Sequence, residues 1–229
     1  LNAVGIEKNG ERQPQPTIRI EETETEESFP LLPYVFFIDG DANLIETDVN
    51  RLQSDRTTHF SEENLPRNTL EIYKDLLNII GSRLTKNPKA TLSLTGTNNT
   101  LGGDKTTPNL SRSRAESVQK YLESVWNISH DRFSISTQNL PQNAANNSNE
   151  DGQAENRRVE ISSNDIEILK PVVLKEIVRT ANPPYVEITP KILSDSGIAS
   201  WNLNVEQNGQ KLRSYQGTGQ PTIQRWDIL

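Results

Sequence analysis

The sequence of 229 residues contains no cysteine and only two histidines. The lack of cysteine excludes disulfides, thiolate nucleophiles and cysteine-ligated zinc. His59 and His130 lie far apart in the chain, and neither has a second histidine at metal-ligand spacing, so both are expected at the surface. We therefore expect no metal ion and no other cofactor.

The sequence also lacks a long apolar run and an excess of basic residues. No stretch approaches the roughly 20 apolar residues of a membrane-spanning helix, and the first ten residues do not resemble a signal peptide. Lys and Arg number 24 against 31 Asp and Glu, which gives a net charge of −7. Because recognition of a nucleic-acid backbone needs a basic stripe, we expect no nucleic-acid partner. The chain starts at Leu1 and is expected to be an excerpt of a longer polypeptide.

Catalytic motifs are missing as well. Ser117 and Lys120 match Ser-x-x-Lys, but the companion motifs of such enzymes are absent, as are G-x-S-x-G and H-E-x-x-H. Residues 102–106 are similar to a phosphate loop, except that Asp104 breaks the Gly-Lys pair and its charge would oppose a phosphate. The sequence therefore predicts a protein that is not an enzyme.

Residues 31–165 carry an alternation of strand and helix patterns. The apolar run 30–38 predicts a strand buried on both faces in the centre of a sheet. Asn68 and Glu71 predict the start of an amphipathic helix that ends near residues 86–88. Further strands are expected at 90–96, 132–136 and 157–162, a second helix at 110–125, and exposed loops at 97–109 and 138–155. This order predicts an α/β (α+β) two-layer sandwich with helices on one face of a mixed sheet.

The flanking residues have a different character. Residues 1–30 hold one short strand candidate at 17–20 and then a run, 21–27, with five carboxylates, so they predict a solvated linker or the end of a preceding β-rich domain. Residues 166–184 are expected to connect the sandwich to a small all-β module, complete or truncated, at 185–229. Alternating strands at 186–188, 199–205 and 211–215, with a turn at 207–209, predict that module.

A set of motifs in residues 33–163 resembles the OmpA-like (OmpA/MotB C-terminal) domain family. That family's patterns are G-x-T-D-x-x-G, L-S-x-x-R-A-x-x-V-x-x-Y-L and G-R-A-x-N-R-R-V-E. The matching positions are Gly96, Gly102, Leu110, Ser111, Arg114, Ala115, Val118, Tyr121, Leu122, Gly152, Ala154 and residues 156–160. The resemblance implies a βαβαβ-β fold and noncovalent binding of peptidoglycan. Residues 201–205, 217–221 and 226–227 resemble bacterial immunoglobulin-like repeats.

The resemblance implies a binding site and also shows where this chain departs from it. Arg114 inherits the role of holding a carboxylate of the diaminopimelate in the stem peptide, which suits a planar guanidinium. The family's ligand-binding Asp falls on Asn99, its Asn on Thr107 and the Arg of G-R-A on Gln153. Because an amide cannot pair ionically with an ammonium group, we expect weak or absent affinity for diaminopimelate. The substitution Asn99→Asp is expected to improve the free energy of diaminopimelate binding by about 1–3 kcal/mol. The candidate peptidoglycan-binding residues are Asn99, Thr107, Leu110, Arg114, Asn156 and Arg157.

These residues also have a structural interpretation. Leu110, like Val118 and Tyr121, fits a core position, and Arg114 fits a structural ion pair. Two functions therefore stay open. The first is a noncatalytic cell-envelope protein, in the periplasm or associated with the outer membrane, that anchors a larger assembly to peptidoglycan and contacts other envelope proteins. The alternative is a scaffold or protein interaction module that keeps the OmpA-like fold without binding a ligand.

Overall fold

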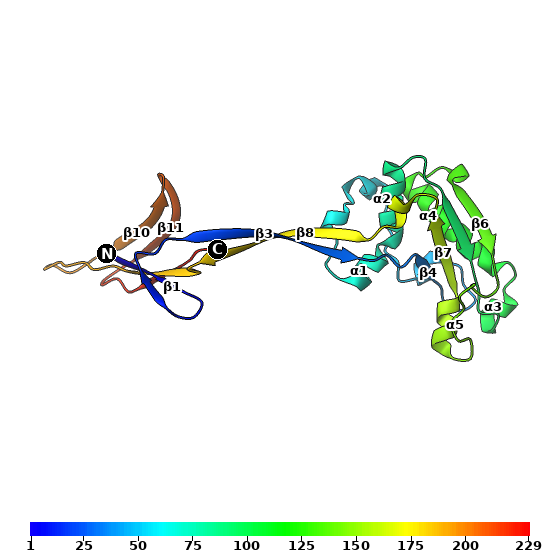
Figure 1. Ribbon diagram of the computed structural model, residues 1–229, viewed down its shortest axis with the longest axis horizontal. Helices are drawn as coiled ribbons and strands as arrows, with labels where there is room; N and C mark the ends of the chain where they lie inside the picture. Colours follow the sequence, from blue (N-terminus) through cyan, green and yellow to red (C-terminus); the bar gives the residue numbers. More distant parts are fainter. The chain divides into compact units, whose positions relative to one another are not determined.

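In the computed structural model, which describes residues 1–229, the chain divides into two units, Glu26–Lys175 and Leu1–Thr25 with Glu176–Leu229. The strands β3 (Arg19–Phe29) and β8 (Val172–Asn182) pair as a two-stranded sheet, and the boundary between the units falls inside both strands. Figure 1 shows the elements of each unit. No helix is long and apolar enough to cross a membrane.

The unit 26–175 is built on a four-stranded mixed sheet. Its strand order is β4 (Tyr34–Phe36), β7 (Arg158–Ser163), β5 (Leu92–Gly96) and β6 (Phe133–Thr137). β5 and β6 are parallel and are connected by α4 (Leu110–Trp126), whereas β7 runs antiparallel to both β4 and β5. The strand–helix–strand unit and the mixed sheet confirm the α/β sandwich that the sequence predicts.

Short helices complete this unit. The side chain of Asn68 accepts hydrogen bonds from the backbone N–H groups of Leu70 and Glu71, and so starts α1 (Thr69–Lys74) as predicted. The expected single helix is interrupted at Asp75, after which α2 (Leu76–Lys86) continues. The remaining helices are α3 (Gly102–Thr106), α5 (Glu150–Asn156), α6 (Ile166–Leu169) and the 3-10 helices η1 (Leu44–Glu46), η2 (Ser54–His59), η3 (Glu62–Asn64) and η4 (His130–Arg132).

The core of this unit lies between the sheet and the helices α2 and α4. The sequence predicts ten residues in this core, of which nine are fully or almost fully buried, and the tenth, Phe133, is partly buried against the same cluster. The buried ones are Val35, Phe37, Leu77, Ile80, Leu92, Leu94, Val118, Leu122 and Val159. The opposite face of the sheet carries hydroxyl groups, for example Ser93 bonded to Ser134 at 2.8 Å. The helices α2 and α4 therefore cover one face of the sheet, as expected for two layers.

The sequence predicts the wrong position in the sheet for β4, the first strand of this sheet. β4 pairs only with β7, so it is an edge strand and not a central one. Val35 and Phe37 point into the core, but Tyr34 and Phe36 are only half-buried on the other face. There the guanidinium of Arg158 lies 4.6 Å from the Tyr34 ring centroid, and Tyr73 contacts Phe36. The apolar run of β4 is therefore explained by the core on one face and by the contacts of Arg158 and Tyr73 on the other.

The other unit is all-β. Its antiparallel sheet has the order β12 (Gln224–Asp227), β9 (Tyr185–Thr189), β1 (Asn2–Ile6) and β2 (Arg12–Pro14). A hairpin of β10 (Trp201–Gln207) and β11 (Gln210–Gly217) turns at Asn208 and Gly209, whose φ angles are 52° and 79°. Two successive positive φ angles are typical of the tight turn that the sequence predicts.

Three stretches differ from the sequence analysis because their partners are remote in sequence. Residues 2–14 contain two strands where none was expected, since β1 pairs with β9. The acidic run 21–27 lies in β3 with every side chain exposed, and most of the expected connecting segment 166–184 is α6 and β8.

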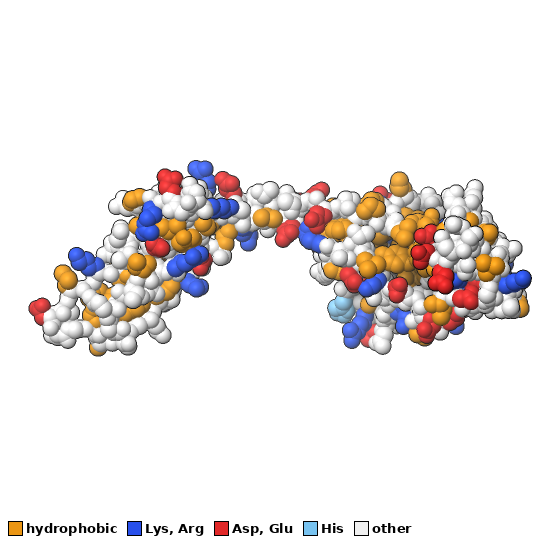
Figure 2. All heavy atoms as spheres, turned by 90° about the horizontal axis from the view of Figure 1, so that it is seen from below, with side chains coloured by type: hydrophobic (Ala, Val, Ile, Leu, Met, Phe, Trp, Pro, Cys, Tyr) orange, Lys and Arg blue, Asp and Glu red, His pale blue; other side chains and the backbone are white.

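On the face that Figure 2 shows, acidic and basic side chains are interspersed.

Candidate functional site

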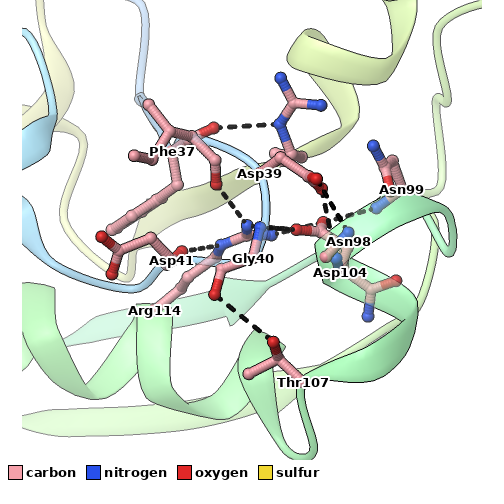
Figure 3. A network of polar contacts seen from close by, with 12 residues as sticks. Phe37, Asp39, Gly40, Asp41, Asn98, Asn99, Asp104, Thr107 and Arg114 are labelled. Atoms are coloured by element: carbon pink, nitrogen blue, oxygen red, sulfur yellow. Dashed lines mark hydrogen bonds and ion pairs between the residues drawn. The ribbon is translucent and has the colours of Figure 1, made fainter.

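The motif residues meet where β5 ends. The segment 37–41 after β4, residues 97–99 after β5, the helix α3 and the second turn of α4 come together there (Figure 3). Gly96 allows α4 to approach β5, because a Cβ atom at this position would lie only 1.8 Å from the backbone oxygen of Ser111. The match of glycine to the family pattern at this position therefore has a steric cause.

Arg114 is the centre of this region and is completely buried. Its Nη1 and Nη2 donate to the two carboxylate oxygens of Asp104 at 2.9 and 2.7 Å. Nε donates to the carbonyl of Asp41 at 2.9 Å, and the two remaining N–H groups donate to the carbonyls of Thr97 and Ile38 at 3.0 Å each. A guanidinium has five N–H donors. All five donors of Arg114 are therefore used within the chain.

Asp104 is as fully engaged as its partner. Its side chain is 0% exposed, and it also accepts hydrogen bonds from the backbone N–H groups of Gly40 at 2.8 Å and Asn99 at 3.0 Å. Burial raises the pKa of Asp104, but the hydrogen bonds from Arg114, Gly40 and Asn99 outweigh it, and the pKa is lowered from its ordinary value. The carboxylate is therefore ionised and paired.

Asp39 and two glycines hold α3 in place. The carboxylate of Asp39 accepts from the backbone N–H groups of Gly103 at 2.8 Å and Asp104 at 3.2 Å. A Cβ atom at Gly103 would lie 2.9 Å from the Cα of Gly40, so the two backbones touch. This close approach brings the N–H of Gly40 within reach of Asp104.

Asn99 takes part in this region mainly through its backbone. The residue is 1% exposed, its side-chain oxygen accepts from the backbone N–H of Leu101 at 2.8 Å, and its carbonyl accepts from Nδ2 of Asn147 at 2.7 Å. No hydrogen bond joins its side chain to Arg114. The position that the family uses for an Asp side chain therefore serves here to shape the loop before α3.

Thr107 and Leu110 border an open, polar cavity of about 650 Å³ beside this region. Thr107 is exposed, with its hydroxyl 3.5 Å from the carbonyl of Gly40, whereas Leu110 is 3% exposed at the start of α4. The other lining residues are Asn98, Thr100, Asp104, Lys105, Asn109, Ser111, Arg112, Thr137, Gln138 and Asn139. Asp104 lines the cavity and Arg114 does not.

Asn156 and Arg157 lie apart from that cavity. Asn156 is completely buried and bonds to both the N–H and the carbonyl of Ala145, at 2.8 and 3.1 Å. Nε of the half-buried Arg157 donates to the carbonyl of Phe37 at 3.2 Å, and its two terminal nitrogens make no hydrogen bond within the chain. Asn156 therefore closes a loop, whereas Arg157 keeps donors that an external group can use.

Asp104 and Asp39 belong to this region, although neither is among the residues predicted for the site. In the sequence Asp104 is notable only because it breaks the Gly-Lys pair of a phosphate loop, and Asp39 matches no motif. No group of three or more acidic or histidine side chains is arranged to hold a metal ion. The charged chemistry of this region is thus that of one buried cation, its bidentate carboxylate and the donors around them.

Comparisons with known proteins match part of the chain to a family model. The model of the OmpA family matches residues 67–157. The peptidoglycan-associated lipoprotein from Burkholderia pseudomallei is 17% identical with a TM-score of 0.39, over 58% of this chain and 90% of that chain. The C-terminal domain of Helicobacter pylori MotB is 19% identical with a TM-score of 0.36, over 59% of this chain and 88% of that chain.

A third similar structure is the cell wall anchor of the T6SS from Pseudomonas aeruginosa. It is 28% identical with a TM-score of 0.32, over 45% of this chain and 72% of that chain. No curated protein matches the sequence. The family match covers β5, α4 and β6 and contains all six candidate residues, so residues 67–157 are the part of the chain that is matched to the OmpA family.

Proposed function

We propose that the chain is a noncatalytic cell-envelope protein, in the periplasm or associated with the outer membrane, that anchors a larger assembly to peptidoglycan. Residues 31–165 would be the anchoring module, with residues 185–229 as an immunoglobulin-like module joined to it by 166–184. The observation that carries the proposal is the match of residues 67–157 to the OmpA family, because this segment holds Asn99, Thr107, Leu110, Arg114, Asn156 and Arg157.

The same proposal includes weak capture of diaminopimelate. The amide of Asn99 offers no negative charge to an ammonium group, and Arg114 has no free donor for a carboxylate. Arg157 is the guanidinium of the matched segment that keeps two unbonded terminal nitrogens. Contact with the wall would then use Arg157 and the cavity beside Thr107 and Leu110.

One observation favours the alternative function, a scaffold or protein interaction module without a ligand. The guanidinium of Arg114 is saturated by Asp104 and three backbone carbonyls, so it serves the fold without any external group. Under this alternative the matched segment keeps the fold of the family, and the chain acts through contacts with other envelope proteins.

Cosedimentation with purified peptidoglycan that contains diaminopimelate tests the two functions. We expect the wild-type chain to sediment with the wall, Arg157→Gln to bind at least about threefold more weakly, and Arg213→Gln to bind as the wild type. Arg213→Gln removes the same charge from the all-β unit. Absence of sedimentation at any protein concentration would favour the scaffold. Release of soluble wall fragments by the chain would contradict the noncatalytic assignment.

A further inference from the structure

Asp104 occupies the position in which an arginine receives a carboxylate ligand. Two parallel N–H···O bonds between a guanidinium and a carboxylate are the strongest and most directional arrangement that arginine offers. Arg114 makes this pair with Asp104, at 2.9 and 2.7 Å, and both side chains are 0% exposed. Figure 3 shows the carboxylate of Asp104 facing the guanidinium of Arg114.

The guanidinium of Arg114 is held by contacts that do not involve Asp104. The other three N–H groups of Arg114 donate hydrogen bonds to the carbonyls of Ile38, Asp41 and Thr97, and these bonds fix the orientation of the guanidinium. The N–H groups of Gly40 and Asn99 complete a set of four donors that converge on the carboxylate. Without the Asp104 side chain, these four donors would surround a buried position that suits one carboxylate.

The open cavity of about 650 Å³ lies beside that position, although the side chain of Asp104 itself is 0% exposed. Asp104 lines this cavity together with Thr107 and Leu110, whereas Arg114 lies behind it. Lys105 and Arg112 also line the cavity, and the net charge of these two residues favours the entry of an anion. An external carboxylate in the cavity therefore reaches Arg114 only when the buried side chain of Asp104 is removed or displaced.

We propose that Asp104 is an internal occupant of a carboxylate-binding position, and that the residue at 104 sets the affinity of this site for carboxylate ligands. A tethered carboxylate competes at a high effective concentration, so an external carboxylate binds Arg114 only where Asp104 is displaced. The inference rests on the proposed function for the identity of the natural ligand, the carboxylate of a peptidoglycan stem peptide. The position itself is a property of this chain.

Formate binding to variants of position 104 tests the proposal in the full chain. In Asp104→Ala we expect sodium formate to raise the thermal midpoint in a saturable way, by at least about 3 °C more than sodium chloride at equal concentration. The wild type and the nearly isosteric Asp104→Asn should respond equally to the two salts, because a side chain still fills the position. Asp131→Ala, which removes an exposed acid elsewhere in the same unit, controls for the change in net charge.

The formate experiment still tests the proposal if Asp104→Ala is too unstable to fold in chloride. If Asp104→Ala is unfolded in chloride, the proposal expects formate to restore its folded circular dichroism spectrum, and Asp104→Ser is measured in parallel. The proposal is overturned if neither variant distinguishes formate from chloride, or if the wild type responds to formate as strongly as Asp104→Ala.

A second readout separates this inference from the proposed function. With meso-diaminopimelate as the probe, we expect Asp104→Ala to bind about tenfold to a hundredfold more tightly than the wild type. Formate binding by Asp104→Ala without any binding of diaminopimelate or peptidoglycan would support the internal occupant and contradict the peptidoglycan anchor. Equal binding of peptidoglycan by the wild type and Asp104→Ala, without a formate effect, would contradict the internal occupant alone.

Discussion

Asn99 and Asp104 are neighbours at the end of β5, where the backbone N–H of Asn99 donates to Oδ2 of Asp104 at 3.0 Å. A carboxylate at position 99 would be buried close to that of Asp104, and Arg114 is the one cation that contacts Asp104. We therefore expect Asn99→Asp alone to lower the free energy of unfolding by about 1–3 kcal/mol, because like charges oppose each other in a buried site.

The double variant Asn99→Asp with Asp104→Asn is the matched control, since it moves the carboxylate and keeps the total charge. It should recover most of the lost stability, because a single carboxylate then remains beside Arg114. Urea unfolding of the wild type and both variants measures this effect. An Asn99→Asp chain as stable as the wild type would contradict this account of the site.

The ion pair of Asp104 also predicts a dependence of stability on pH. Its pKa is lowered in the folded state by hydrogen bonds to Arg114 and to backbone N–H groups, despite the opposing effect of burial. A lowered pKa stabilises the fold fully above the unfolded-state value of about 3.9, and this contribution is lost as the pH falls through the lower folded value. The difference in unfolding free energy between the wild type and Asp104→Asn should therefore be constant from pH 7 to about pH 5 and shrink below about pH 4.

The sequence could indicate Arg114 but not its partners. A motif places the arginine on a helix, and its burial follows from the amphipathic pattern. Asp104 contacts it through α3, which the sequence analysis expected to be a loop. The hydrogen bonds from Arg114 to the carbonyls of Ile38 and Asp41 cannot be predicted from residue types, because every residue has a carbonyl. Whether Arg114 is free or saturated could therefore be learned only from the structure.

At the scale of elements, the Asn-rich stretch 138–155 is more ordered than its composition indicates. It contains the start of α5, and Asn156 at the end of that helix bonds to the N–H and the carbonyl of Ala145. Asn147 also donates to the carbonyl of Asn99. Composition alone predicts a loop here, because asparagine favours turns. The loop is held closed by the side-chain hydrogen bonds of Asn147 and Asn156, which composition does not reveal.

Asn156→Ala tests this closure. The change leaves the partly buried N–H and carbonyl of Ala145 without their partner, which should cost about 1 kcal/mol in the free energy of unfolding. Limited proteolysis should then cut residues 141–149 several times faster than in the wild type, since the loop is released. Ser148→Ala, an exposed change in the same loop, should leave the cleavage rate unchanged. Equal cleavage of the wild type and Asn156→Ala would show that the loop is closed by other contacts.

The elements that the sequence predicts well are those whose signal is local. The helix α4 has a long amphipathic repeat, and the hairpin of β10 and β11 has an Asn-Gly turn, so both lie where expected. β4 was assigned to the centre of the sheet because its apolar run is continuous, but Arg158 and Tyr73 supply the contacts on its second face. Position within a sheet depends on the partner strands, which a local pattern does not contain.

At the scale of the whole chain, the divisions between units were the hardest to predict. β1 and β9 pair although they lie at opposite ends of the sequence, and β3 pairs with β8. The exposed strand β3 carries no apolar alternation that could indicate its pairing. The apolar residues of β1 and β9 indicate strands, but they do not indicate which strand is the partner. The unit that contains the family match is Glu26–Lys175, and it has its own buried core.

The two units should therefore differ in their ability to fold alone. Both clusters of buried apolar residues lie wholly between residues 29 and 174, within the unit Glu26–Lys175. The buried apolar residues of the other unit are few, namely Val4, Ile6, Ala181, Val186 and Ile188. Because burial of apolar surface is the main stabilising contribution to folding, we expect a fragment of residues 26–175 to fold in isolation.

Calorimetry of this fragment and of the full chain measures the prediction. The fragment should unfold in one transition, within about 4 °C of the main transition of the full chain, because about 1 kcal/mol shifts the midpoint of a domain of this size by a few degrees. A circular dichroism spectrum with helix and strand should accompany it. A fragment that is unfolded at 25 °C, or that melts far below the full chain, would mean that residues 1–25 and 176–229 supply stability that the separate cores do not indicate.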